Sequence, residues 1–319
     1  MLKRVLFFLL CASTLMAVNV YKPYLQIDVR SPARDIVLKD DLLYIGTDSG
    51  NLLVYDYKKK RFVKKIQIPK IKDFMGDSVD AKVFSVDFED GRYLLLSDSG
   101  EGGYSNLWIH ENNITTQVIS PKDKDAIIKA RFVDKDHILL GFLGDEAALF
   151  DLKTKKEIYR HQLSPSKFSD FALNEERSMA AFGCESGEIN VINVKDGKIV
   201  KKLDGINKDN VYKVDFKAGV VVGAGQDRRA SIYDLESSKG DFIQGNFLIY
   251  AAALSPGAKR AAFAMDEDND IFIYKLPSKE NIAVLKGQKS TLNAIIFKSD
   301  KVLFSSSDDN IVNMWKIDE

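Results

Sequence analysis

Cysteine, histidine and tryptophan are scarce in this 319-residue sequence, with 2, 3 and 2 copies respectively. Cys11 lies in an apolar N-terminal run, so Cys184 stands alone once that run is removed, and an internal disulfide is then excluded. Three dispersed histidines without a Cys-x-x-Cys-His sequence argue against a haem or copper centre. Two tryptophans argue against the recurrent tryptophans of quinone-cofactor dehydrogenases. The sequence therefore predicts no cofactor and no redox role.

Net charge and long apolar runs are also missing. Basic and acidic residues balance at 46 each, which gives no bulk attraction to nucleic acid or anionic lipid. No later run approaches the roughly 20 apolar residues of a membrane span. Hydrophobic residues still make up 45% of the chain, enough for a sizeable core. We therefore expect a globular protein with no nucleic-acid partner and no membrane span after its leader is cleaved.

The first residues have the layout of a secretory signal. Two basic residues precede the apolar run Val5–Leu10, and small residues follow up to Ala17. Because this layout is typical of a leader cleaved during export, we expect residues 1–17 to be removed and residues 18–319 to form a single periplasmic domain. A retained N-terminal anchor and lipid attachment at Cys11 are the alternatives.

A repeat of three or four short strands organises the rest of the chain. The ends of the third strands recur about every 41 to 42 residues from His110 onward, which is the period of four-stranded propeller blades. Seven units are counted from their opening strands, which begin at Asp35, Val83, Ile127, Phe168, Val211, Ile249 and Leu292. One small sheet cannot bury both its faces, so the repeat predicts blades stacked around an axis.

The ring must also close. The seventh unit ends near Trp315 and supplies three strands but no fourth. Tyr21–Val29 precedes the first full unit and has the composition of a strand. We expect this N-terminal strand to complete the last blade.

The pattern resembles the WD-repeat family over essentially the whole chain after the leader. The matching sequences are three aromatic–aspartate pairs and two turns, at Tyr55-Asp56, Phe150-Asp151, Tyr233-Asp234, Gly46–Gly50 and Ser305–Asn310. Two features depart from the family: no Gly-His dipeptide opens a repeat, and only Trp315 is a tryptophan at the motif position. The resemblance implies an all-β, seven-bladed WD-repeat-type β-propeller whose second-to-third-strand turns share one face.

Those turns are mostly acidic. They contain Asp48, Asp98, Asp145, Glu185, Asp266, Asp268, Asp308 and Asp309. Arg228 and Arg229 interrupt the series in the fifth unit. Some of these acids are expected only to shape their own turns. The other interpretation is a charged rim that steers a basic partner.

One acidic turn invites comparison with a calcium loop. Asp266–Asp270 alternates carboxylates as calcium loops do. The glycine of such loops is absent, and Pro277 stands where the bidentate glutamate would be. We therefore expect a solvated turn and no metal site.

A partner-binding surface is predicted around blades one and two. The connection Pro69–Lys82 is too long for a simple link and carries Phe74 and Met75 at its middle. The second unit is also stretched at Gly100–Asn106, which contains Tyr104. Aromatic and methionine side chains on such loops suit an interface anchor. A flexible insertion is the alternative. The candidate binding residues are Phe74, Met75, Tyr104, Arg228 and Arg229.

No cluster of catalytic residues emerges from the sequence, and Cys184 has no paired base near it. We therefore expect a protein-binding scaffold and not an enzyme. The whole chain also resembles the WD-repeat-like accessory proteins of periplasmic nitrate reductase systems, which implies a role in supporting that reductase. An outer-membrane assembly scaffold and a propeller enzyme remain alternatives. The sequence leaves the oligomeric state open.

Overall fold

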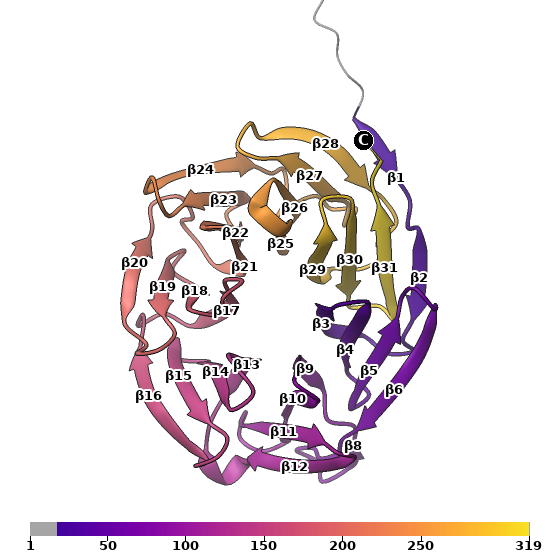
Figure 1. The fold of residues 1–319 in the computed structure, drawn as a ribbon, viewed down its shortest axis with the longest axis vertical. Coiled ribbons are helices and arrows are strands. Elements are labelled where there is room, and N and C mark those ends of the chain that lie inside the picture. The colour runs from indigo at the N-terminus through magenta and orange to yellow at the C-terminus, as the bar shows by residue number, and fades with distance from the viewer. Residues whose placement is uncertain (1–17, 319) are drawn as a thin grey trace, which may run out of the picture.

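Seven small sheets surround a central axis in the computed structural model, which describes residues 18–318 (Figure 1). In five of these sheets the first strand along the chain lies nearest the axis and later strands lie progressively further out, and in the other two a strand from the N-terminus is added at the outer edge. Antiparallel pairing joins consecutive strands of a blade. The predicted all-β, seven-bladed WD-repeat-type propeller is confirmed. The expected leader, residues 1–17, lies outside the described residues.

Each blade follows one segment of the chain. Blade one contains β3 (Ala33–Lys39), β4 (Leu42–Thr47), β5 (Asn51–Asp56) and β6 (Arg61–Gln67). Blade two contains β9 (Val83–Glu89), β10 (Arg92–Asp98), β11 (Ser105–Glu111) and β12 (Ile114–Ile119). Blade three contains β13 (Ile127–Phe132), β14 (His137–Phe142), β15 (Glu146–Asp151) and β16 (Lys156–Gln162). Blade four contains β17 (Phe168–Leu173), β18 (Met179–Cys184), β19 (Ile189–Asn193) and β20 (Ile199–Leu203).

The last three blades repeat this order. Blade five contains β21 (Val211–Lys217), β22 (Val220–Gly225), β23 (Arg229–Asp234) and β24 (Lys239–Gln244). Blade six contains β25 (Ala251–Leu254), β26 (Arg260–Ala264), β27 (Ile271–Lys275) and β28 (Glu280–Leu285). Blade seven takes β29 (Leu292–Ser299), β30 (Val302–Ser307) and β31 (Ile311–Lys316) from the C-terminus. Two short 3₁₀ turns lie between blades two and three (Pro121–Asp123) and within blade six (Pro256–Ala258).

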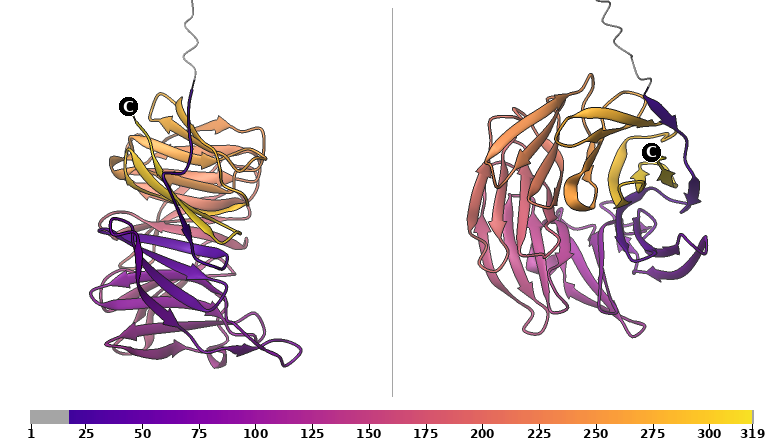
Figure 2. Two further views of the ribbon diagram at one scale, coloured as in Figure 1. Left: turned by 90° about the vertical axis from the view of Figure 1, so that its right-hand side faces the viewer. Right: turned by 45° about the horizontal axis from the view of Figure 1, so that its top comes forward.

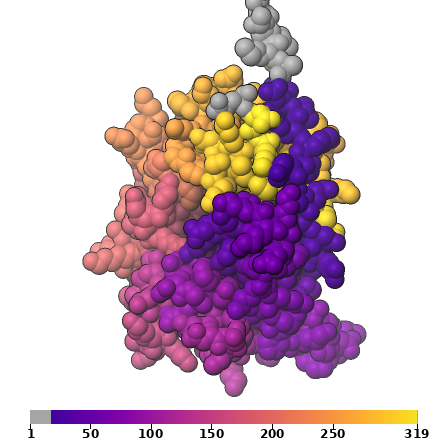
Figure 3. All heavy atoms as spheres, turned by 45° about the vertical axis from the view of Figure 1, so that its right-hand side comes forward, coloured from indigo at the N-terminus to yellow at the C-terminus, as the bar shows by residue number. Residues whose placement is uncertain are grey.

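The N-terminal segment closes the ring, as predicted, but as two strands where one was expected. β2 (Leu25–Asp28) pairs antiparallel with β31 and becomes the outer strand of blade seven. β1 (Asn19–Tyr21) instead pairs parallel with β28 and becomes a fifth strand of blade six. Pro23 lies between them and has no N–H to continue a ladder. Figure 3 shows these N-terminal residues, in indigo, against the yellow C-terminal ones.

The apolar core is divided among the blade interfaces. Seven clusters of buried residues are found, and each joins two neighbouring blades. At the closing interface, Ile27 and Val29 from the N-terminus pack with Met314 of blade seven and Ile36 of blade one. The N-terminal strand therefore supplies core as well as backbone pairing. No helix in residues 18–318 is long and apolar enough to span a membrane.

Candidate functional site

The long connection between blades one and two forms an ordered hairpin. β7 (Ile71–Lys72) pairs with β8 (Ser78–Val79). The Asp73 carboxylate accepts hydrogen bonds from the backbone N–H groups of Met75 (2.9 Å) and Asp77 (2.8 Å). Gly76 occupies the left-handed region, with φ +87°, where a side chain would be strained. The insertion therefore forms a short hairpin with a defined turn.

Two apolar side chains lie at the tip of this hairpin. Phe74 is 99% exposed and Met75 is 80% exposed. The hairpin projects outward from the ring, at the lower right of the left-hand view in Figure 2. The predicted anchor residues are thus presented to solvent on an ordered support.

The stretched turn of blade two packs against the base of the hairpin. A Cβ atom on Gly100 would lie 2.0 Å from the carbonyl oxygen of Lys72, so only glycine allows this approach. The Ser99 hydroxyl donates to the carbonyl oxygen of Tyr104 at 2.8 Å and fixes the turn. Tyr104 is partly exposed beside Gly102. The structure therefore brings together the two insertions that the sequence singled out.

Arg228 and Arg229 lie elsewhere: Arg228 is in the β22–β23 turn and Arg229 begins β23, and these strands are across the ring from β8 (Figure 1). The Arg229 guanidinium donates to the carbonyl oxygen of Ile206 at 2.6 Å and lies 5.0 Å from the ring of Phe242. Arg228 is exposed, but its carbonyl oxygen accepts from Gly245 at 2.8 Å. These arginines do not share a surface with Phe74, and Arg229 serves to pack its own blade.

The acidic rim is less uniform than expected. Arg34 pairs with Asp48 and with Asp308, each at 2.6 Å, and neutralises part of the negative charge of the rim. Asp145 is fully buried, with 0% exposure, and does not reach the rim at all. Burial also raises the pKa of Asp98. At Asp48, Asp145 and Asp308 the rim therefore presents less negative charge than the sequence predicts.

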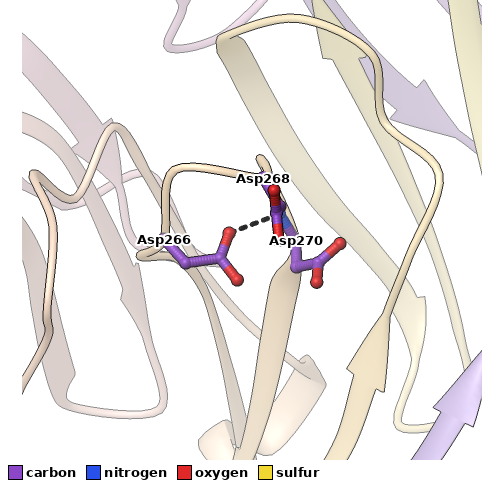
Figure 4. A group of neighbouring side chains, drawn as sticks. All are labelled: Asp266, Asp268 and Asp270. Carbon is purple, nitrogen blue, oxygen red and sulfur yellow. Dashed lines mark hydrogen bonds between the residues drawn. The ribbon is translucent and has the colours of Figure 1, made fainter.

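The acidic turn of blade six gathers three carboxylates. Asp266, Asp268 and Asp270 offer oxygen atoms that all lie within 4.8 Å of one another (Figure 4). Asp266 accepts from the backbone N–H of Asp270 at 2.8 Å, which shapes the turn. Asp270 is buried and pairs with the ammonium of Lys286, so its charge is already balanced. Asp268 is exposed, as expected for a solvated turn. Asp270 is buried, so the prediction of a solvated turn does not hold for this residue.

The remaining polar candidates are separate. His110 contacts Thr115, His137 contacts Asp134, and His161 stacks on Tyr159. Cys184 is buried at the end of β18, with its sulfur 3.2 Å from the Ser186 hydroxyl. In the described part of the chain these side chains form no shared cluster of metal ligands.

Sequence analysis missed a network of charged side chains around the channel. Aspartates on the first strands of four blades accept backbone N–H groups from the next blade, in the pairs Asp35–Val86, Asp87–Phe132, Asp170–Val214 and Asp215–Leu254. Burial raises the pKa of Asp87, whereas nearby Lys129 holds the pKa of Asp170 below its usual value despite the desolvation that opposes it. These bonds tie neighbouring blades together at the axis.

A comparison of equivalent positions in successive repeats could have revealed this network. In five of the blades the third residue of the opening strand lines the channel, and these residues are Asp35, Lys129, Asp170, Lys213 and Ala294. Charged residues at equivalent positions of successive repeats are expected to meet, since a propeller brings its first strands together. Two cavities of about 330 and 350 Å³ lie along the channel, with four of these residues in both walls.

Comparison with known proteins supports a WD-repeat-like propeller. No protein-family model matches the chain. Two curated relatives, from Drosophila persimilis and Drosophila pseudoobscura pseudoobscura, are both WD repeat-containing protein 55 homologs. Each is 20% identical over 298 residues, which cover 87% of this chain and 54% of the relative. The chain thus spans about half the length of the curated relatives that it matches.

Proposed function

We propose that the protein is a non-catalytic scaffold that binds another protein through the tip of the β7–β8 hairpin. The observation that carries this proposal is Phe74, which is 99% exposed on a turn that Asp73 holds in place. Exposed apolar side chains gathered at one point mark interaction sites. The likeness to WD-repeat proteins agrees with this role.

The tip can supply binding free energy without much loss of entropy. Burying a phenylalanine or a methionine side chain contributes about 1.5–3 kcal/mol each. Because the turn is ordered before binding, little backbone freedom is lost when a partner covers it. Tyr104, on the turn that packs beneath the hairpin, is the candidate for a second contact. Arg228 and Arg229 are not part of this surface.

We place this scaffold in the periplasm, in support of a nitrate reductase system. The apolar leader-like run before residue 18 favours export. The resemblance of the chain to NapL, an accessory protein of periplasmic nitrate reductase, favours that partner. A role as an outer-membrane assembly scaffold is the competing hypothesis, and it needs the same exported location.

A crosslinking pull-down from the periplasm tests the binding surface. The double variant Phe74→Asp/Met75→Asp should recover less than about a tenth of the partner that the unmodified protein recovers. The reason is that two charges cannot enter an apolar pocket without a counter-ion. Both side chains are exposed, so its thermal midpoint Tm should stay that of the unmodified protein.

Ile114→Asp is the matched control. Ile114 is 67% exposed and follows the β11–β12 turn, which lies on the opposite face from the hairpin. It should retain the partner. Equal recovery by the double variant and the unmodified protein would contradict the proposed surface. Mass spectrometry of the captured partner separates a reductase component from outer-membrane assembly machinery.

A further inference from the structure

Two lysines compete for one buried carboxylate in the central channel. Lys129 Nζ lies 2.6 Å from Asp170 Oδ1, and Lys213 Nζ lies 3.8 Å from the same oxygen. The other carboxylate oxygen accepts the backbone N–H of Val214 at 3.1 Å. The Asp170 side chain is 3% exposed, so it is already fully engaged. The ammonium of Lys213 is left without a hydrogen bond among the described residues, because 3.8 Å is too long for one.

Apart from Asp170, no carboxylate of the described residues lies within ion-pair distance of Lys213. The other carboxylate at this level, Asp35, is held by Arg131 at 2.9 Å and by the backbone N–H of Val86. Asp87 lies near Arg131, and Asp215 lines the adjoining cavity, so the other cations of the channel have carboxylates beside them. Burial and the nearby cations lower the pKa of Lys129, against the opposing effect of Asp170. Among Lys129, Arg131 and Lys213, Lys213 is the cation that has no carboxylate oxygen of the described residues closer than 3.8 Å.

A cavity is present where an anion would fit. It has a volume of about 350 Å³, and Lys213 lies in its wall together with Phe84 and Ile128. The Lys213 side chain is 33% exposed, so its ammonium remains accessible. The lining also includes Asp35 and Asp170, whose charges are balanced by Arg131 and Lys129, so the cavity offers the ammonium of Lys213 beside two apolar side chains. This combination suits a carboxylate on a short aliphatic chain.

We propose that this cavity binds such a carboxylate, with the ammonium of Lys213 as its counter-ion. The carboxylate can come from a free dicarboxylic acid or from a glutamate side chain of a peptide. A charge-assisted hydrogen bond at a partly desolvated site is stronger than one in water. The site does not involve the β7–β8 hairpin, so a test of carboxylate binding is independent of a test of the proposed function.

Isothermal titration calorimetry with glutarate, a blocked Gly-Glu-Gly peptide and inorganic phosphate tests the proposal. Glutarate or the peptide should bind the unmodified protein, and whichever binds more tightly identifies the source. Lys213→Met should weaken that binding at least tenfold, whereas Lys213→Arg should retain it. Lys217→Met is the control, because Lys217 lines the other cavity and lies 3.9 Å from Asp215.

Folding of Lys213→Met is expected to be normal, since Lys129 still pairs with Asp170 and Arg131 with Asp35. Chemical shifts of the Lys213 side chain in the unmodified protein give a second measure that needs no variant. The proposal is overturned if neither carboxylate probe binds, or if Lys213→Met binds them equally well. Phosphate binding as tight as glutarate would also overturn it. Phe74→Asp should bind glutarate normally.

Discussion

Asp145 is a single residue whose environment conflicts with its charge. It is 0% exposed, and neither carboxylate oxygen has a hydrogen-bond partner in residues 18–318. Burial raises its pKa from 3.8 to about 7. At a pH between these two values, the Asp145 carboxyl is therefore protonated in the folded state and ionised in the unfolded chain. Stability should fall as the pH rises through this window.

Asp145→Asn should remove that penalty. The amide carries no charge, so the variant should be more stable than the unmodified protein, with a gain larger at about pH 8 than at about pH 5 by roughly 2–3 kcal/mol. Urea unfolding at the two pH values measures the difference. Asp48→Asn is the contrast, because it loses the pair with Arg34 and should destabilise at both. A pH-independent gain at position 145 would show that the carboxylate is ionised when folded.

Sequence could identify exposed anchors but not buried charges. Phe74 and Met75 were found because apolar residues in an overlong connection have nowhere obvious to pack. Asp145 was placed on an exposed rim, yet it is fully buried, with Cys184 and Glu188 of the next blade near it. The contact between Lys129 and Asp170 was missed, since it joins residues 41 positions apart. Burial and pairing of this kind depend on contacts between blades, which local patterns do not encode.

Individual strands were easier to predict where they alternate or repeat. The opening strand of each blade was found because its pattern recurs at a fixed period. β7 and β8 were not, because strands of two residues carry no alternation. The pairing of β1 with blade six was also missed, since three residues do not show which sheet edge they join. β2 was predicted from the missing fourth strand of blade seven.

Deleting residues 18–30 tests the role of β2. The deletion removes both backbone pairing with β31 and the buried side chains Ile27 and Val29. Each buried aliphatic side chain contributes about 1.5–3 kcal/mol, so Tm should fall by about 10 °C or more.

Deleting residues 18–22 alone is the matched control. It removes β1 and leaves β2 in place, so Tm should fall much less. Scanning calorimetry of the two deletions compares them directly. Equal midpoints for the two would mean that β2 does not close the ring.

At the scale of the whole molecule, stability and recognition are separated in space. The ring is held by seven interfaces and by carboxylate bonds around the axis. The hairpin lies outside that ring, and its tip contributes little to the core. A surface of this kind can change its partner without changing the fold. The proposed carboxylate site lies in the channel, at a separate place from the hairpin tip.

Photo-crosslinking from the hairpin tip inside the cell tests the central claim most directly. A benzoylphenylalanine residue in place of Phe74 should give one dominant protein adduct, because the tip would be enclosed by its partner. The same residue in place of Ile114 should give none of that adduct. Identical adducts from both positions, or none from position 74, would contradict a scaffold that binds through this hairpin.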